Sequence, residues 1–254
     1  MKMKKRRDEI VSIVNEKNEV GVTELSKKFN VSKPTIRADL NELDEQGLIH
    51  RTHGGAKKKE LDFPLKDSEY DERKLKNIED KKEIAKKALS LIEDDDCICL
   101  DASSTCYELA KLIFYSDKKI TVLTSGLRTA NLLKESNNLT VIIIGGIVKA
   151  KSNAVEGNLS SSLIQMFNIK IFFTSSYAIS INEGLSDFSL HEANLKNELI
   201  RSSLKTVALI DHTKFNKNSI IKFGNLSDIN AIITDKKISP EVYKQYSQRI
   251  DIIK

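Results

Sequence analysis

The segment SKPTIRADLNELDEQGLIHRTHGG, residues 32–55, changes its pattern halfway along and decides how the first part of the chain folds. Its first half predicts a helix, because Ser32 can cap the first turn and Pro34 stands where a missing N–H costs little. Gly47 marks the end of that helix. The second half is short, basic and tipped by glycine, which is typical of a β-hairpin rather than of more helix.

The predicted helix has one apolar face and one polar face. Its apolar residues recur at i, i+4 and i+7, and they are Ile36, Leu40 and Leu43. The opposite face has no evident partner within the chain, and it carries Lys33, Thr35, Arg37 and Asn41. A helix that leaves such a face free is available to bind something else.

Residues 48–53, after Gly47, alternate as a strand does. Gly54-Gly55 then permits a tight turn before the three lysines at 57–59. The sequence therefore predicts a hairpin with a cationic return strand.

The residues before this segment complete a module. Lys4 to Lys17 has apolar residues at helical spacing, and Thr23 is expected to cap a second short helix in which Leu25 and Phe29 share a face. Two short helices across so tight a turn form a helix-turn-helix, whose second helix can enter the major groove while the hairpin lies along the phosphates as a wing. The residues expected to contact double-stranded DNA are Thr23, Ser32, Lys33, Thr35, Arg37, Asn41, Arg51, His53, Lys57, Lys58 and Lys59.

The charge of the chain supports a polyanionic partner. The 254 residues favour two domains, and residues 1–59 contain 14 Lys and Arg against 9 Asp and Glu, which leaves 27 of each for the rest. The whole net charge of +5 therefore belongs to the N-terminal module. Each cation near a phosphate releases a condensed counterion, so this module suits DNA.

A membrane surface is the competing polyanion. The sequence fits it less well, because it has no basic amphipathic helix with large exposed apolar residues, no apolar run of about 20 residues and no signal peptide. We therefore expect a cytoplasmic protein without membrane contact.

The three cysteines, Cys97, Cys99 and Cys106, do not predict a metal site or a disulfide. The first two lie two residues apart in an apolar run, which places them on one face of a strand as small buried hydrophobes. Zinc would require C-x-x-C pairs or a nearby pair of histidines, and the four histidines are scattered. We expect no metal and no cofactor.

A second domain is predicted over 79–254, after a polar linker over 60–78. It opens with an amphipathic helix that ends at Asp94-Asp95-Asp96, and six short apolar runs alternate with helical segments from there on. The runs are mostly β-branched, which indicates a parallel sheet covered on both faces. The predicted fold is a winged helix-turn-helix followed by a doubly wound, mostly parallel α/β domain.

The loops that follow the strands of such a sheet meet at one edge, where ligands bind. These loops are rich in hydroxyl groups and glycine. A Ser/Ser/Thr run at the start of a helix offers hydroxyls and free amides to a phosphate, while Asp101 and Asp211 could hold sugar hydroxyls and Lys196 or Lys214 could balance the charge. Each loop taken singly is also explained by ordinary caps and turns.

These residues together resemble the DeoR family of bacterial transcription regulators. TELSKKFNVSKPTIRADLNELDEQGLIHRTHGGA is similar to the family's winged helix-turn-helix, and EIAKKALSLI, DASST, HEANLK, DHTKF and IITD follow in the family's order. The resemblance implies a regulator, most often a repressor of sugar metabolism, whose second domain is similar to ribose-5-phosphate isomerase and binds a phosphorylated sugar. The implied effector residues are Asp101, Ser103, Ser104, Thr105, Thr124, Ser125, Gly145, Gly146, Glu192, Lys196, Asp211 and Lys214.

Three departures from the family pattern stand out. The family usually has a second arginine after Arg37, where this chain has Ala38, and G-T-T where it has Ser103-Ser104-Thr105. It also usually has an Asp near Lys170 and a Gly near Ser175. The last departure is expected to change the charge of the effector pocket.

Two other functions remain open from the sequence. The second domain could be a sugar-phosphate isomerase, against which Lys170 argues because isomerisation needs a carboxylate base. The chain could also be an architectural DNA-binding protein whose second domain only assembles. No G-x-S-x-G, G-x-x-x-x-G-K-[ST] or G-x-G-x-x-G motif is present. A homo-oligomer, dimer or tetramer, is expected because two-fold symmetric operators are met by symmetric proteins.

Overall fold

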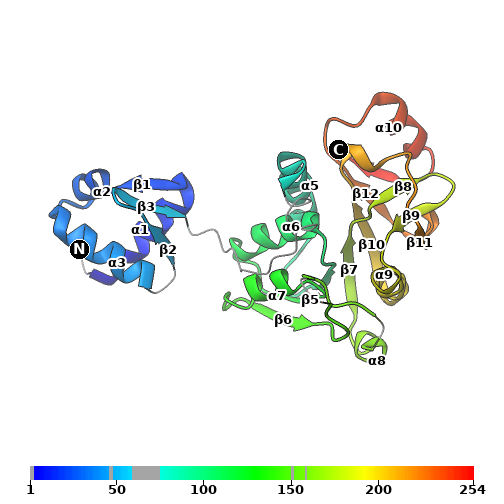
Figure 1. The fold of residues 1–254 in the computed structure, drawn as a ribbon, viewed down its shortest axis with the longest axis horizontal. Helices are drawn as coiled ribbons and strands as arrows, with labels where there is room; N and C mark the ends of the chain where they lie inside the picture. The colour runs from blue at the N-terminus through cyan, green and yellow to red at the C-terminus, as the bar shows by residue number, and fades with distance from the viewer. Residues whose placement is uncertain (1–2, 46–47, 59–74, 150–151, 158) are drawn as a thin grey trace. The chain divides into compact units, whose positions relative to one another are not determined.

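A computed structural model describes residues 3–45, 48–58, 75–149, 152–157 and 159–254 (Figure 1). The chain divides into two compact units, and the division falls within residues 59–74, outside the described part. Each unit has a hydrophobic core of its own.

The N-terminal unit packs helices against a small antiparallel sheet. Its core is formed by the apolar stripes that the sequence predicted, including Ile10, Ile36 and Leu40, all fully buried. The strands lie in the order β1-β3-β2. Its elements in chain order are α1 (Met3–Lys17), β1 (Glu19–Gly21), α2 (Val22–Phe29), α3 (Lys33–Glu45), β2 (Ile49–Arg51) and β3 (Gly55–Lys58).

The predicted hairpin is confirmed, and it gains a third strand that the sequence did not indicate. β3 pairs with β2 and also with β1, which is only three residues long. Gly55 is required by this close approach, because a Cβ there would lie 2.0 Å from the carbonyl oxygen of Val20. The glycine thus admits a neighbouring strand rather than only a turn.

The helix-turn-helix is confirmed with one correction. Ser32 caps α3, since its Oγ accepts the amide of Thr35 at 3.3 Å. The expectation that Thr23 caps α2 is wrong: α2 begins at Val22, and the amide of Val22 donates to the carbonyl of Gly54 at 2.9 Å. The wing turn therefore does what a side-chain cap would do, and Thr23 is an exposed residue of the first turn. The predicted stop at Gly47 lies outside the described residues.

The C-terminal unit is built on a seven-stranded sheet in which every pairing is parallel. The strand order is β13-β12-β10-β7-β4-β5-β6. The strands are β4 (Cys97–Leu100), β5 (Ile120–Thr124), β6 (Leu139–Ile143), β7 (Ile169–Thr174), β10 (Ser203–Leu209), β12 (Ala231–Ile233) and β13 (Asp251–Ile253). All six predicted strands are confirmed, and β13 is additional.

Helices cover both faces of this sheet, so the doubly wound prediction is confirmed. Figure 1 shows α5, α6 and α7 on one side and α9 on the other. The buried face of α9 shares one core with Cys99 and Phe172 of the sheet. The helices are α5 (Ile78–Leu89), α6 (Ser104–Phe114), α7 (Leu127–Leu133), α8 (Ser161–Ile164), α9 (Leu190–Ser202) and α10 (Pro240–Ser247).

A second, antiparallel sheet packs on the side of α9, and the sequence analysis missed it. It has the order β11-β9-β8, from β8 (Ala178–Ser180), β9 (Gly184–Asp187) and β11 (Ile221–Gly224). Gly184, with φ of 70°, stands where a Cβ would meet the carbonyl oxygen of Gly224 at 2.2 Å. This sheet brings Asp187 toward the carboxyl end of the main sheet, with consequences described below.

The order of the main sheet places its switch point between β4 and β7. From β4 the chain moves outward through β5 and β6, and then returns to β7 on the other side of β4. Ligands of open parallel sheets bind outside the carboxyl ends of the strands at such a point. The loops that begin at Asp101 and Ser175 therefore flank the position expected for a ligand.

Candidate functional site

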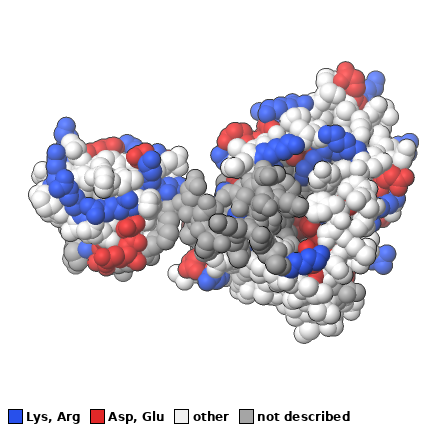
Figure 2. Space-filling model, viewed as in Figure 1, with Lys and Arg blue, Asp and Glu red and all other residues white. Residues whose placement is uncertain are grey.

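The polar face of α3 is exposed, as the sequence predicted. Lys33, Arg37 and Asn41 are all exposed, and neither Lys33 nor Arg37 has an ion-pair partner among the described residues. Thr35 is half-buried, and its hydroxyl lies 2.8 Å from that of Ser32. Figure 2 shows Lys and Arg side chains forming a band across this unit. A cationic helix face with unengaged side chains is what a DNA groove requires.

The opposite side of α3 is fixed by a buried ion-pair cluster that the sequence analysis missed. Asp39 is buried, and its two carboxylate oxygens lie 2.6 Å from Nε of Arg6 and 2.9 Å from Nε of Arg7. Both arginines belong to α1, so the cluster ties the first helix to the recognition helix. The i, i+3 spacing of Asp39 from Ile36 on the apolar stripe was the available signal.

The wing presents a mixed set of side chains. Arg51 and His53 are exposed, and Lys57 is exposed with Glu19 at 3.3 Å. Lys58 is half-buried, and Lys59 lies outside the described residues. An exposed pair such as Lys57–Glu19 is weak, so a phosphate can compete for this lysine.

In the C-terminal unit the centre of the candidate site is the buried ammonium of Lys196, which is 3% exposed. Nζ lies 2.7 Å from Asp187, 3.1 Å from Glu192 and 3.4 Å from Asp101. It also donates to the carbonyl of Ser175 at 2.9 Å. One cation is therefore surrounded by three carboxylates from different elements.

The pKa values of Lys196 and Glu192 are both raised in this cluster, for different reasons. Burial lowers the pKa of Lys196, but the charges of Asp187, Glu192 and Asp101 outweigh it and hold the pKa well above its ordinary value. Burial raises the pKa of Glu192, and Asp187 and Asp101 add to that rise while Lys196 opposes it. Lys196 thus stays charged, and Glu192 takes up a proton at a higher pH than an ordinary glutamate does.

Asp101 follows β4 and fixes the loops around it. Its oxygens accept the amides of Ser103 at 2.9 Å and Ser175 at 2.8 Å, and the hydroxyl of Thr174 at 2.8 Å. Burial raises the pKa of Asp101, but the charge of Lys196 and the hydrogen bonds lower it by more. The resulting pKa lies below the ordinary value. Direct contact of Asp101 with a sugar stays a prediction, since its oxygens already have three protein donors.

Lys214 joins the same centre from another loop. Its Nζ donates to Oγ of Ser175 at 2.8 Å and to the carbonyl of Ser176 at 2.7 Å. Burial lowers the pKa of this lysine, although Asp211, 3.9 Å away, opposes the shift. Asp211 itself accepts the amide of Thr213 at 3.1 Å. Of the two predicted lysines, Lys214 is the one that no carboxylate approaches closely.

The start of α6 holds the predicted hydroxyl run. Ser103 is the cap, and its Oγ accepts the amide of Cys106 at 3.2 Å. Ser104 and Thr105 are buried in the first turn. The hydroxyl of Thr105 has no hydrogen-bond partner among the described residues, and the same is true of Ser176 after β7. Two buried hydroxyls without partners near a free helix start suit an anionic ligand.

The remaining predicted residues lie on neighbouring loops. Thr124 accepts the amide of Gly126 at 3.0 Å, and Ser125 is buried beside it. Gly145 and Gly146 are exposed after the outer strand β6, without a contact to Lys196 or Asp101 among the described residues. The structure therefore brings Thr124 and Ser125 to the same sheet edge but leaves the two glycines at its periphery.

The expectation that Lys170 changes the charge of the pocket is wrong. Lys170 lies at the amino end of β7, about 13 Å along the strand from Thr174. It pairs there with Glu93 at 2.6 Å and Asp96 at 2.7 Å. Besides Asp101 and Glu192, the centre contains Asp187, which sequence reasoning missed because β9 is a strand of the second sheet. Lys170 therefore gives no reason to exclude an enzyme.

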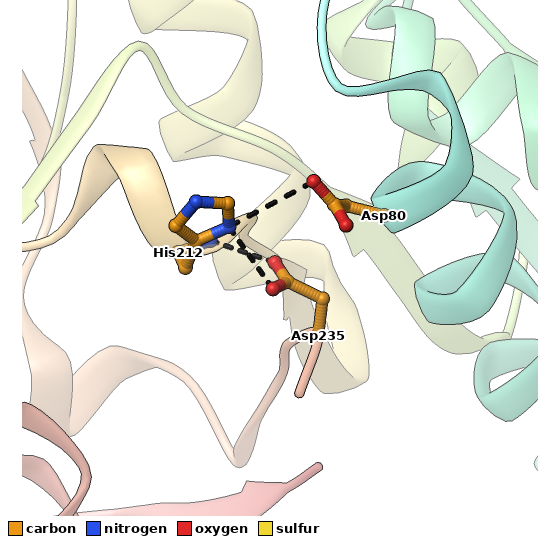
Figure 3. A group of neighbouring side chains, drawn as sticks. All are labelled: Asp80, His212 and Asp235. Carbon is orange, nitrogen blue, oxygen red and sulfur yellow. Dashed lines mark hydrogen bonds and ion pairs between the residues drawn. The ribbon is translucent and has the colours of Figure 1, made fainter. Parts of the chain in front are cut away.

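A further cluster links the start of α5 to the end of the sheet (Figure 3). Nδ1 of His212 lies 3.0 Å from Asp235 and 3.8 Å from Asp80, without the alignment of a hydrogen bond. The three ligand atoms lie within 4.8 Å of one another, a spacing a metal ion could bridge. Nζ of Lys237, however, lies 2.7 and 2.9 Å from the two oxygens of Asp80. A cation of the chain already neutralises that carboxylate.

Two surface hollows lie elsewhere. One of about 510 Å³ is lined by Ser180 and Gln245, and one of about 520 Å³ by Asn197 and Phe223, and neither is lined by a predicted effector residue. All three cysteines are free thiols. Among the described helices, each is too short or too polar to traverse a lipid bilayer.

The fold and these two surfaces define a class of protein. A winged helix-turn-helix with a free cationic recognition face precedes a parallel α/β domain with a polar centre at its switch point, the organisation of a DNA-binding regulator with a ligand-sensing domain. Residues 6–60 match the DeoR-like helix-turn-helix domain, and residues 76–236 match the DeoR C-terminal sensor domain. The chain belongs to the DeoR family of transcription regulators.

Several relatives match nearly the whole chain. The HTH-type transcriptional regulator GolR of Listeria innocua is 39% identical, covering 95% of this chain and 94% of its own. The L-fucose operon activator of Haemophilus influenzae is 37% identical (97% and 98%), and the lactose phosphotransferase system repressor of Staphylococcus epidermidis is 33% identical (91% and 91%). Both activators and repressors thus occur among them.

Solved structures match part of the chain. Ribose 5-phosphate isomerase A from Neisseria gonorrhoeae is 16% identical with a TM-score of 0.39, over 53% of this chain and 52% of that one. A match at this level carries no functional argument.

Proposed function

We propose that the chain regulates transcription of a sugar-metabolism operon and that a phosphorylated sugar bound at the carboxyl edge of the parallel sheet modulates its affinity for operator DNA. The observation that carries the effector proposal is the pair of buried, unpartnered hydroxyls of Thr105 and Ser176, close to the start of α6 and to Lys214. A phosphate fits there, because the first amides of a helix and a nearby ammonium both favour an anion.

The geometry divides the expected roles. Lys214 and the first turn of α6 are the groups left for the phosphate, since Lys196 is already balanced by Asp101, Asp187 and Glu192. The cluster around Lys196 then fixes the loops that carry those groups. Glu192, whose side chain is 15% exposed, is the member that can still meet a sugar hydroxyl.

Thermal-shift measurements with ribose 5-phosphate, glucose 6-phosphate, fructose 1-phosphate and glycerol 3-phosphate test the proposal. A ligand present at a hundred times its Kd stabilises a protein by about 2.7 kcal/mol. Thr105→Val should reduce that stabilisation, because it removes one hydroxyl contact to the ligand and keeps the volume. Thr121→Val, at the amino end of β5, is the matched control and should respond as wild type does. Equal responses of both variants would refute the assignment of Thr105.

The direction of regulation follows from operator binding. The relatives include a named repressor and a named activator. We expect repression, tested by transcription from the operator in vitro with and without the chain. A homo-oligomer is proposed because a two-fold symmetric operator is matched by a symmetric protein. Sedimentation of the free chain, measured by analytical ultracentrifugation, tests this proposal.

An isomerase remains the alternative of another class, favoured by the raised pKa of Glu192. A carboxylate that acts as a base must lie within hydrogen-bond distance of the proton that it removes. The carboxylate of Glu192 instead pairs with the ammonium of Lys196 at 3.1 Å. We therefore expect no turnover of ribose 5-phosphate. Turnover lost in Glu192→Gln would establish the enzyme instead.

A further inference from the structure

We propose that the first turn of α5 carries the state of the effector site to the DNA-binding unit, through contacts of Asn77 and Asp80 with the loop 211–214. This inference rests on the proposed function and names the regulation of that same site. Asn77 and Asp80 are positioning residues here, because neither is expected to touch the sugar phosphate or the DNA.

The position of α5 in the chain makes it the natural output. The helix begins at Ile78 and is the first named helix that the structure describes after residues 59–74, which connect the chain to the DNA-binding unit. Whatever moves the first turn of α5 therefore moves the covalent end of that connection. Coupling between two sites needs such an element with contacts that differ between states.

Asn77 connects this turn to the loop. Its side-chain amide donates to Oδ1 of Asp211 and to Oγ1 of Thr213, both at 3.2 Å. Asn77 is also held in the left-handed region, with φ of 56°, and its side chain makes no cap on its own helix. The side chain is thus committed to the loop instead of to the helix that it precedes.

Asp80 makes the second connection, one turn further on. It approaches His212 of the loop, and His212 is held from the sheet by Asp235, whose other oxygen accepts the backbone amide of His212 at 2.8 Å (Figure 3). Lys237 closes the group on Asp80. The start of α5 is therefore hydrogen-bonded to the loop through Asn77, and Asp80 lies 3.8 Å from the loop residue between the two partners of Asn77.

The other end of the loop lies in the effector site. Lys214 follows Thr213 directly, and its ammonium binds Ser175 and Ser176. A phosphate that attracts the ammonium of Lys214 must weaken its hydrogen bonds to Ser175 and Ser176. The loop itself is a single 3-10 turn, His212–Lys214, with Asp211 as its cap. So short a turn has little slack to absorb a shift of Lys214, and the shift reaches Asn77 and Asp80.

Asn77→Gly tests the relay. Glycine keeps the left-handed backbone without strain and removes only the two side-chain hydrogen bonds. Operator DNA is first selected from a random library by the wild-type chain, and its affinity is then measured with and without each of the four sugar phosphates and inorganic phosphate. A wild-type response of about 5- to 150-fold is typical of coupled sites, and in Asn77→Gly it should fall to within about two-fold. The thermal shift produced by the same compounds should stay unchanged.

Asp95→Gly is the matched control. Asp95 is exposed, lies beyond the far end of α5 and has φ of 65°. Glycine therefore replaces a residue in the left-handed region here too, but at a position without a contact to the loop 211–214. It should keep the wild-type response. Asp80→Asn, which retains the shape of the side chain, should weaken the response as Asn77→Gly does and covers the case in which the glycine variant does not fold.

The outcomes separate the relay from the function on which it rests. A full response in both Asn77→Gly and Asp80→Asn would overturn the relay and leave the proposed function standing. Loss of ligand binding in Asn77→Gly would also overturn it, because Asn77 would then belong to the effector site. If wild type and Asp95→Gly both fail to respond to every compound, the proposed function itself is refuted.

Discussion

The two groups of cations in this chain differ in burial and in the charges around them. On α3 the cations Lys33 and Arg37 are exposed and have no ion-pair partner among the described residues, whereas Lys196 of the sensor domain is buried among three carboxylates. An exposed cation retains its charge for an outside partner such as DNA. A buried ammonium with three carboxylate partners is neutralised inside the protein and fixes the positions of the elements that carry those carboxylates. Cations in a sequence therefore indicate a binding surface only where the fold leaves them free.

The largest expected effect comes from removing the buried cation. Lys196→Met leaves Asp101, Asp187 and Glu192 facing one another without a counter-charge, which should lower the free energy of unfolding of the sensor domain by about 3–5 kcal/mol. Urea denaturation followed by circular dichroism measures it.

Lys170→Met is the matched control for that substitution. Lys170 also pairs with two carboxylates, but its side chain is 38% exposed, and the loss should be much smaller than in Lys196→Met because water screens the pairs. Equal losses in the two variants would show that burial of Lys196 does not set its role.

Asp101 and Glu192 should make the stability of the protein depend on pH in opposite directions. The lowered pKa of Asp101 means that its contribution to stability is present above the ordinary value of about 3.9 and is lost as the pH falls through its lower folded value. Asp101→Asn should therefore destabilise at neutral pH, by about 1–3 kcal/mol because buried donors lose an acceptor, and the deficit should shrink in acid.

Glu192→Gln should behave in the opposite way. Because its folded pKa is raised, the ionised carboxylate opposes folding above that value, and the opposition disappears as the pH falls below it. The variant should be at least as stable as wild type at pH 7 and lose this advantage in acid. Unfolding measured from pH 3 to pH 8 compares both variants, and a large loss of stability in Glu192→Gln at neutral pH would contradict the direction of the shift.

On the DNA-binding side the expected effect is on affinity rather than on stability. Arg37→Ala should weaken binding to the selected operator by about 1–3 kcal/mol, with a smaller loss on random DNA, if the side chain reads a base edge. Fluorescence anisotropy on both DNAs measures the difference, with Arg201→Ala, exposed in the sensor domain, as control. Equal losses on the two DNAs would make Arg37 a phosphate contact.

The smallest effect is expected at the wing. Lys57 is exposed and pairs only with the exposed Glu19 among the described residues. Lys57→Gln should flatten the slope of log K against log salt by at most about 0.9, the contribution of one phosphate contact. An unchanged slope would mean that Lys57 does not contact DNA.

The predictions from sequence succeeded where the signal is local. Ser32 caps α3 as expected, and each of the six apolar runs is a strand, because a β-branched run between turn signals has few alternatives. The failures involve distant partners. Thr23 loses the predicted cap because the carbonyl of Gly54 satisfies the amide of Val22, an interaction between residues more than thirty positions apart.

The candidate site shows the same division. Asp101 and Lys214 were named from their loops and Lys196 as a charge partner for the ligand, and all three meet at the switch point. Asp187 was missed because nothing local distinguishes an acid at the end of a short strand from a solvated one. Lys170 was assigned to the pocket from the family pattern, although its place in the second position of β7 puts it at the amino end of the strand, away from the loops.

The sequence by itself determined that this protein pairs a basic winged helix-turn-helix with a parallel α/β domain, since hydrophobic periodicity, turn residues and net charge are properties of short stretches of chain. Only the tertiary structure decided which charges are free and which are consumed. The packing of α9 and β9 against β4 and β7 places Lys196 among Asp101, Asp187 and Glu192, and the return of the loop 211–214 onto α5 brings Asn77 to Asp211. Electrostatic pairing depends on distance and burial, and both are fixed by residues far apart in the sequence.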